Sequence, residues 1–247
     1  MGKLQKRKGW HRGIDMGLRK VLMTGLALIC SLGLVHSVFA FTWTEVGDAG
    51  DLLATAQEAL GEGPLTSISG TLTLVGDSNS PKDADMYKIF IANPGTFSAT
   101  TVLPGVTLDT QLFLFDSDGR GVYANDDDVL DSSLEPVRST LPAGHLSGQS
   151  VAGFYYLVIT SFNLDPVSPG GLIFPGSFSA VEGPTGPGGG SAITGYTDNG
   201  TTGTTGAYTI ALTDVSANPV PEPATLLLLG SGAAGVAWAA RNRQRRK

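Results

Sequence analysis

Phe154-Tyr-Tyr-Leu-Val-Ile159 carries six apolar or aromatic side chains in succession, and Gln111-Leu-Phe-Leu-Phe115 has the same character. Successive side chains of a β-strand point to opposite faces, so such runs are typical of strands whose sheet is covered on both faces. Gly, Pro, Asn and Asp separate these short runs from their neighbours, which favours strands. We therefore predict two central strands around which the rest of the chain is organised.

Other stretches alternate between apolar and polar residues, as half-buried strands do. Residues 68–74, 97–100 and 208–213 each have one apolar and one hydroxyl-rich face. In Asp85–Ile91 the side chains of Tyr87, Ile89 and Ile91 share one face. Several short strands with turn residues between them predict an all-β fold, a single antiparallel β-sandwich of jelly-roll type over residues 67–217.

Two segments between residues 41 and 217 lack this alternation. Residues 41–66 form an N-terminal extension, in which Asp51–Leu60 has Ala and Leu near helical spacing after a capping Asp, so a short helix is expected. Residues 183–206 are rich in Gly and Thr without a hydrophobic period. We expect a mobile surface loop there, in preference to a functional lid.

The first forty residues have the features of a secretory signal peptide. Seven Lys or Arg residues precede an apolar run from Val21 to Val35, and Val38-Phe39-Ala40 is a small-residue cleavage site. Sec-type export and cleavage between Ala40 and Phe41 are therefore expected. Met16 is an alternative initiator that would give a signal of ordinary length. Cys30, the one cysteine, lies in the apolar run, so the mature protein is expected to have neither thiol chemistry nor disulfides.

The C-terminal residues 220–247 combine three features in a fixed order. Pro221-Glu222-Pro223 precedes an apolar run over residues 224–240, and a basic tail follows at residues 241–247 with Arg241, Arg243, Arg245 and Arg246. As a helix the apolar run spans roughly 25 Å, slightly short of a hydrocarbon core of about 30 Å. The basic tail places its own end in the cytoplasm and the body of the protein outside.

This three-part tail resembles the PEP-CTERM sorting signal of bacterial surface proteins. The resemblance implies that exosortase, a membrane enzyme, cuts near the Pro-Glu-Pro motif, so that the helix is a transient inner-membrane anchor. The protein would then pass to the cell surface or to an extracellular matrix of exopolysaccharide. The alternative is a permanently anchored single-pass surface protein, because a short span with a basic stop is common to such anchors.

The body resembles the bacterial pre-peptidase C-terminal domains, which are small exported jelly-roll sandwiches. The resemblance rests on residues 68–72, 83–90, 109–119, 152–159 and 208–212 in this order. It implies a non-catalytic accessory or adhesive module, of which some relatives bind calcium or surface polymers. An exopolysaccharide or another surface polymer is the partner that this resemblance suggests.

The charge of the exported region excludes one class of partner. Between residues 41 and 240 the chain has twenty-one acids against four Lys or Arg residues, a formal charge near −17. Nucleic-acid binding needs clustered Lys and Arg, so nucleic acid is not an expected partner. An acidic exported domain instead suggests solubility or cations held between carboxylates.

The residues that suggest chemistry are acidic. Asp116-Ser-Asp118-Gly119 is followed by Asn125-Asp-Asp-Asp128, and Asp83, Asp85 and Asp109 lie at strand ends. The loop is not an EF-hand, because Arg120 occupies a ligand position. Two interpretations remain. The first is a calcium site made by Asp109, Asp116, Asp118, Asp126 and Asp128, with Asp127 on the opposite side of an extended chain. The second is a hairpin turn at Asp118-Gly119 with solvated carboxylates.

Catalytic signatures are absent from the exported sequence. His145 is its one histidine and lies in a turn, so a His and Cys zinc site lacks ligands. No Gly-x-Ser-x-Gly elbow precedes it, which argues against a serine triad. We therefore expect a non-catalytic protein. The alternative is a carbohydrate-directed enzyme or lectin that uses the acidic loops, since paired carboxylates can hydrolyse glycosides.

Overall fold

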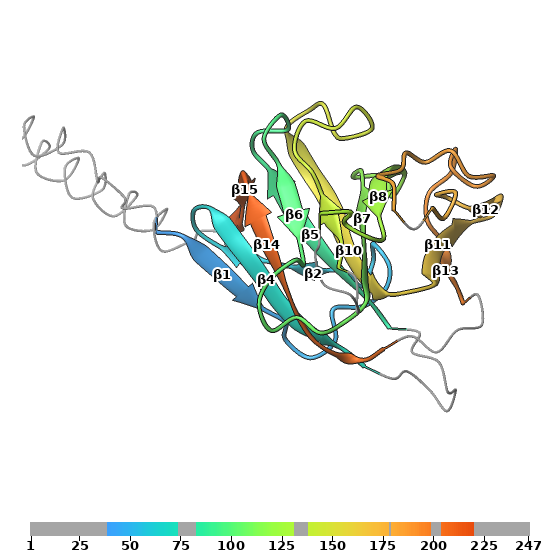
Figure 1. The fold of residues 1–247 in the computed structure, drawn as a ribbon. Coiled ribbons are helices and arrows are strands. Elements are labelled where there is room, and N and C mark those ends of the chain that lie inside the picture. Colours follow the sequence, from blue (N-terminus) through green and yellow to red (C-terminus); the bar gives the residue numbers. More distant parts are fainter. Residues whose placement is uncertain (1–38, 74–82, 131–137, 178, 199–203, 220–247) are drawn as a thin grey trace, which may run out of the picture. The chain divides into compact units, whose positions relative to one another are not determined.

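The structure is a computed structural model that describes residues 39–73, 83–130, 138–177, 179–198 and 204–219. Within these ranges all regular elements are β-strands, as the sequence predicted (Figure 1). No helix among the described residues is both long and apolar enough to cross a membrane. The signal segment up to residue 38, the apolar run 224–240 and the basic tail lie outside the described residues.

The strands of the described residues form four sheets. The five-stranded sheet has the order β1 (Phe41–Thr44), β4 (Leu65–Leu72), β14 (Gly206–Thr213), β6 (Ser98–Thr100), β9 (Thr140–Leu141). The central sheet has the order β15 (Val215–Ser216), β5 (Ala84–Ile91), β10 (Gly153–Ser161), β7 (Thr110–Phe115), β8 (Gly121–Asn125), and β2 (Gln57–Glu58) also pairs with β5. The smaller sheets are β12 (Gly171–Leu172), β11 (Leu164–Ser168), β13 (Gly195–Asp198), and the pair β16 (Asn218–Pro219), β3 (Leu60–Gly61).

The two apolar runs are central strands, which confirms the prediction made from them. β10 lies between β5 and β7, and Leu157 is opposite Tyr87 on one side and Leu114 on the other. Leu157 and Val158 are both fully buried although they point to opposite faces of the sheet. Both faces of the central sheet are therefore covered.

One face of the central sheet packs on the five-stranded sheet. A single buried cluster joins Tyr87, Leu114 and Leu157 of the central sheet to Ile68 and Ile210 of the five-stranded sheet. Each of these strands contributes alternate residues, as period-two patterning requires. This cluster is the main hydrophobic core of the described residues.

The opposite face of the central sheet is covered by residues 164–177 and 179–198, which we call the excursion (Figure 1). Phe113 and Phe115 of β7 lie with their ring centroids 5.6 and 5.9 Å from that of Phe174 in the excursion. Ile173 and Ile193 of the excursion are buried in the same cluster. The excursion thus explains why β7 and β10 are apolar on both faces.

Three expectations differ from the structure. The helix expected over Asp51–Leu60 is absent: a single turn, in which Leu52 O accepts from Thr55 N and Ala56 N, is followed by β2 and β3. Pairing of Gln57 with Tyr87 of β5 overrides the weak helical preference.

The segment expected as a loop, 183–206, contains β13, which pairs with β11. The sheets are not wholly antiparallel, because β1 with β4, β2 with β5 and β16 with β3 are parallel pairs.

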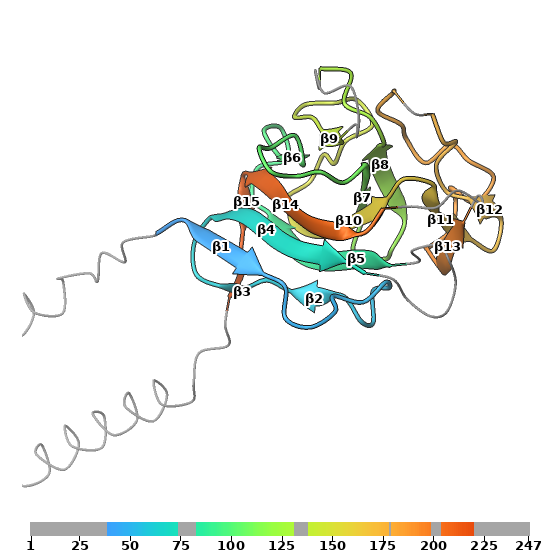
Figure 2. The ribbon, with the colours of Figure 1, turned by 60° about the horizontal axis from the view of Figure 1, so that its bottom comes forward.

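The two ends of the described body meet at Gly61. Phe41 N donates to Pro64 O at 2.7 Å, and a Cβ on Gly61 would lie 2.9 Å from the Phe41 ring. Pro219, the last described residue, is the register partner of Gly61. Figure 2 shows β1 and β3 side by side. Phe41 and Pro219, near the two ends of the described body, therefore both neighbour Gly61.

Candidate metal centres and sorting motif

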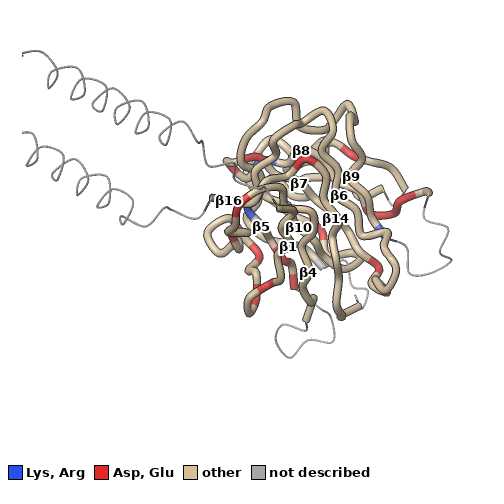
Figure 3. Tube along the Cα trace, turned by 90° about the vertical axis from the view of Figure 1, so that its left-hand side faces the viewer, with Lys and Arg blue, Asp and Glu red and all other residues tan. Residues whose placement is uncertain are grey.

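Acidic residues far outnumber basic ones over the described body (Figure 3). Its Lys and Arg residues are Lys88, Arg120 and Arg138. Lys88 Nζ pairs with Glu58 Oε1 at 2.8 Å. The guanidinium groups of Arg120 and Arg138 donate to the carbonyl oxygens of Gly190 and Leu103. These cations are therefore directed to partners in separate parts of the fold and form no basic patch.

Asp116 and Asp118 lie at the tip of the hairpin that joins β7 to β8. Asp116 Oδ1 accepts from Asp118 N and from Arg120 N, both at 2.9 Å. Asp116 N donates to Arg120 O at 2.9 Å, and Gly119 has a φ of 79°, which favours glycine. The Asp116 side chain therefore organises a tight turn, as the hairpin interpretation expected.

The five aspartates suggested for one calcium site do not converge. Asp109 precedes β7 and Asp126 follows β8, so both lie at the open end of the hairpin. The six residues of β7 place the tip roughly 20 Å away at about 3.4 Å per residue. Asp128 accepts from Leu130 N at 2.9 Å. Asp109 and Asp126 are the members of the set that the structure brings together.

Asp109, Asp126 and Asp127 form what we call the first acidic centre. One carboxylate oxygen of each lies within 4.8 Å of the others. Asp127 was expected on the opposite side, but β8 ends at Asn125, so strand alternation does not extend to this residue. Sequence reasoning missed Asp127 for that reason. Asp127 is the middle residue of the run Asp126–Asp128, and this run was the signal that could have found it.

Asp126 is the most buried member of the first acidic centre, with 8% of its surface exposed. Its Oδ1 has no hydrogen-bond partner among the described residues. Burial, with smaller contributions from four neighbouring acids, raises the pKa of Asp126 to about 8; these acids are Asp127, Asp109, Asp165 and Glu182. The ionised form of Asp126 is thus strongly disfavoured unless a positive charge is present.

A small pocket adjoins Asp126 between the central sheet and the excursion. Its volume of about 20 Å³ is enough for one water molecule. Gln111 and Asp165 line it, and Gln111 Nε2 donates to Asp165 Oδ1 at 3.1 Å. Glu182, also in the lining, accepts from Gly176 N and Ser177 N at 2.9 and 2.8 Å. The pocket is polar on the side of the acids.

Glu45, Asp48 and Asp85 form what we call the second acidic centre, with carboxylate oxygens within 4.8 Å of one another. Glu45 and Asp48 follow β1, whereas Asp85 lies near the start of β5. The sequence analysis noted Asp85 at a strand end but missed the other two. Their spacing of three residues directly after an alternating strand was the signal that could have found them.

Asp85 is fully buried between the two large sheets. Tyr208 Oη donates to Asp85 Oδ2 at 2.5 Å, and the Tyr208 hydroxyl lies 2.6 Å from that of Tyr87. Asp85 Oδ1 has no hydrogen-bond partner among the described residues. Burial raises the pKa of Asp85 to about 8, against the lowering effect of the Tyr208 hydrogen bond.

Backbone N–H groups donate hydrogen bonds to Glu45 and Asp83, two acids near Asp85. Glu45 accepts from Ala49 N at 3.1 Å and from Thr71 N at 2.8 Å. Asp83 Oδ2 accepts from Thr73 N at 2.5 Å, and Asp83 adds to the negative field around Asp85. A Cβ at residue 70 would collide with the Tyr208 hydroxyl and with Glu45 Oε2, so glycine at this position leaves room for both.

Each acidic centre offers three carboxylates, which is the ligand chemistry that calcium and other hard cations prefer. The two centres lie on opposite faces of the central sheet, since Asp85 faces the five-stranded sheet and Asp126 lines the pocket beneath the excursion. His145 belongs to neither: its Nδ1 accepts from Ser147 N at 3.2 Å, and its ring stacks on Tyr123 at 6.3 Å.

Comparison with known proteins places the tail in a defined class. Residues 219–246 match the PEP-CTERM protein-sorting motif, which includes Pro221-Glu222-Pro223 and four arginines of the basic tail. The motif implies export, a membrane-anchored sorting signal and processing by exosortase. The resemblance of the body to pre-peptidase C-terminal domains is not confirmed by a family match. No curated protein and no solved structure matches the chain.

Proposed function

We propose that this chain is a non-catalytic structural or adhesive protein of the bacterial cell surface or extracellular matrix, delivered there after exosortase cleaves it near Pro221-Glu222-Pro223. The sorting motif at residues 219–246 is the observation that carries the proposal. The acidic, strand-rich body supports it, because a domain of high net charge stays soluble outside the cell. Its partner is an exopolysaccharide or another surface polymer.

The route begins with Sec-type export and removal of residues 1–40. Phe39 and Ala40 are exposed, and β1 begins at Phe41, so cleavage between Ala40 and Phe41 leaves every described strand intact. The apolar run 224–240 then holds the protein in the inner membrane with the basic tail in the cytoplasm. Exosortase cleavage converts this anchored form into the surface or matrix form.

Calcium belongs to this proposal as a structural cofactor. The second acidic centre supports it, because Asp85 is fully buried and its Oδ1 lacks a partner among the described residues. A calcium ion there would be held by Glu45, Asp48 and Asp85 and would tie the N-terminal segment to β5. The outside of a cell contains enough calcium for sites of modest affinity.

The experiment is fractionation of cells with and without exosortase, with the C-terminus of the protein read by mass spectrometry. With the enzyme we expect the protein in the surface or matrix fraction, ending near residue 223. Without it we expect the intact chain to Lys247 in the membrane fraction. An intact C-terminus and a membrane location in both strains would instead establish a permanently anchored single-pass protein.

A further inference from the structure

Asp126 lies where three parts of the fold meet: the end of β8, the residue that precedes β7, and the excursion. It is 8% exposed, and its Oδ1 has no hydrogen-bond partner among the described residues. A buried carboxylate oxygen without a partner destabilises the fold by the full desolvation cost of the group. Such a group therefore points to a species that is bound in solution.

A water molecule, a proton or a divalent cation can satisfy Asp126. A water molecule in the adjoining pocket donates a hydrogen bond but leaves the charge of the three carboxylates in place. A proton neutralises this one carboxylate but leaves the oxygens of Asp109 and Asp127 within 4.8 Å of it. A divalent cation neutralises most of the charge of all three carboxylates at once and uses their oxygens as ligands. We infer that the first acidic centre is a divalent-cation site of the calcium type, made by Asp109, Asp126 and Asp127.

The coordination number of calcium fits this arrangement. Calcium takes six to eight oxygens and accepts carboxylates in monodentate or bidentate geometry. Three carboxylates supply three to six of these oxygens. The pocket of about 20 Å³ beside Asp126 has room for a water molecule that supplies one further oxygen. Magnesium fits less well, because it demands a tighter octahedral shell.

The cation would fasten the excursion to the central sheet. Ala124 of β8 and Glu182 of the excursion exchange backbone hydrogen bonds of 2.9 and 2.8 Å. Asp165 and Glu182 of the excursion both add to the negative field at Asp126. Without the cation, repulsion between these acids acts across the contact between excursion and sheet. With the cation, the same acids stabilise that contact.

The test counts the calcium ions bound to the full-length chain in detergent by equilibrium dialysis against radioactive calcium. We expect Asp126→Asn to bind one ion fewer than the unmodified chain. Asp116→Asn is the matched control, since it removes an acid from the tip of the same hairpin, and it should bind as many ions as the unmodified chain. Equal binding by Asp126→Asn and the unmodified chain would overturn the inference.

Two further variants separate this site from the calcium in the proposed function and guard against misfolding. Asp85→Asn should remove a different ion, so the double variant with Asp126→Asn should bind two fewer. Asp127→Asn should weaken calcium binding at least tenfold while the carboxylate of Asp126 is kept.

Hydrogen exchange adds a second readout: calcium should slow exchange in residues 164–198 of the unmodified chain but not of Asp126→Asn. Calcium-independent exchange in the unmodified chain would also overturn the inference.

Discussion

Two buried carboxylates, Asp85 and Asp126, are costly for this fold to keep ionised. Each is almost fully buried, and each has an oxygen without a hydrogen-bond partner among the described residues. Burial raises the pKa of each to about 8. The groups that face Asp85 are Asp83, Glu45, Asp48 and Tyr208, and those that face Asp126 are Asp127, Asp109, Asp165 and Glu182.

These two residues predict how stability depends on pH in the absence of metal. The pKa of each is near 8 in the folded chain and near 4 in the unfolded chain, so the folded state binds more protons between these values. Stability from these groups is fully present below about pH 4 and is lost as the pH rises to about 8. In chelator, the contribution of these two groups should lower the melting temperature as the pH rises from 4 to 8.

The measurement is a thermal melt at several pH values with chelator, for the unmodified chain and for the Asp85→Asn and Asp126→Asn double variant. The neutral amides cannot titrate, so the double variant should lose much of the pH dependence. Parallel curves for the two proteins would show that these carboxylates are not protonated in the folded state. Added calcium should flatten the curve of the unmodified chain, because it binds the ionised form.

The sequence predicted part of this chemistry at the residue scale. Asp109 and Asp126 were selected as cation ligands and do lie together. Asp116 and Asp118 were selected with them but lie at the tip of the hairpin, which the length of its strands separates from the open end. Asp128 was also selected, but its Oδ1 accepts from Leu130 N and it is not part of the first acidic centre. Glu45 joins Asp85 across a long sequence separation, and such a contact leaves no local pattern in the chain.

The strands are the elements that the sequence predicted best. Residues 68–74, 85–91, 111–115, 154–159 and 208–213 all overlap strands of the two large sheets. Alternation and turn residues are local signals, so they can be read without knowledge of the partners. The parallel pairing of β2 with β5 was not predictable in this way, because it depends on which distant strand lies beside Gln57.

The excursion is a second case in which local sequence does not predict the contacts that a segment makes. Its Gly-rich sequence has no hydrophobic period, yet Ile173, Phe174 and Ile193 are buried against the central sheet. A few well-spaced apolar residues suffice to cover a face that is already apolar. The two-sided hydrophobicity of β7 and β10 was the indirect sign that something had to cover their second face.

Phe174 should therefore matter more than its place in a loop-like segment suggests. It is 4% exposed and contacts the rings of Phe113 and Phe115. Phe174→Ala should lower the free energy of unfolding by about 3–5 kcal/mol, as large truncations in cores do. Denaturant melts give this value, with Leu146→Ala as the control, because Leu146 is fully exposed. A change within about 0.5 kcal/mol for both variants would mean that the excursion does not stabilise the sheet.

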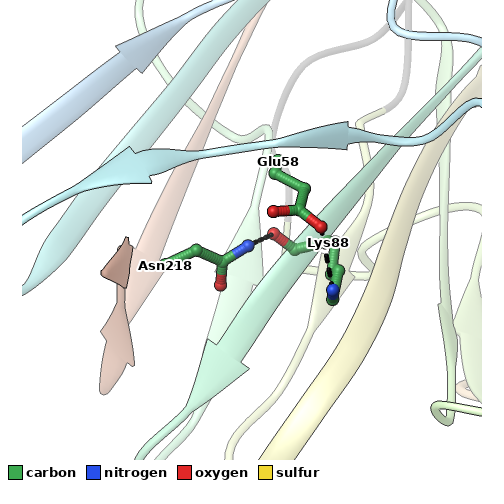
Figure 4. Close-up of polar contacts among 3 residues, drawn as sticks. All are labelled: Glu58, Lys88 and Asn218. Atoms are coloured by element: carbon green, nitrogen blue, oxygen red, sulfur yellow. Dashed lines mark hydrogen bonds and ion pairs between the residues drawn. The ribbon is translucent and has the colours of Figure 1, made fainter. Parts of the chain in front are cut away.

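Two contacts of unequal weight meet at Lys88 of β5, one from Glu58 of β2 and one from Asn218 of β16 (Figure 4). Glu58 forms a partly exposed ion pair with Lys88 at 2.8 Å, and such pairs contribute about 0–1 kcal/mol. Asn218 is 3% exposed, and its Nδ2 donates to Lys88 O at 3.1 Å. Removal of the Asn218 amide leaves the Lys88 carbonyl oxygen without this hydrogen bond, which lowers the free energy of unfolding by about 1–3 kcal/mol.

Asn218→Ala should accordingly destabilise the body more than Glu58→Gln does. Denaturant melts at low and high salt separate the two, because the Glu58 contribution should fall with salt and that of Asn218 should not. If Glu58→Gln proves the more harmful, the ion pair from β2 and not the buried amide of β16 is the stronger of the two contacts at Lys88.

At the scale of the whole molecule, the chain is organised by its two ends. The body begins at Phe41 and its last described residue is Pro219, and both lie beside Gly61. The segments predicted to enter a membrane would thus join the body at one place, so both can reach the same membrane surface. The sequence predicts the order of these segments and the charge of the body between them. Only the structure shows that Phe41 and Pro219 both lie beside Gly61.

The tether between body and sorting motif is short. β16 ends at Pro219, the motif match begins at the same residue, and Val220 is the one residue between β16 and Pro221. Five peptide units from Pro219 to Ala224 span at most about 18 Å when fully extended. In the anchored form the body is therefore held close to the membrane, and cleavage near Pro221–Pro223 has to occur beside a folded strand pair.

This geometry predicts that access to the motif limits processing. Insertion of ten Gly and Ser residues after Pro219 should speed loss of the C-terminal tail, because the flexible linker adds roughly 17 Å of reach between β16 and the motif. A pulse-chase experiment in cells with exosortase measures the rate of that loss. The same insertion after the exposed Leu146 is the control and should leave the rate unchanged. Asn218→Ala should also speed processing, since it weakens the β16 end. Equal rates for the insertion after Pro219 and the control would show that exosortase reaches the motif with the strand pair intact.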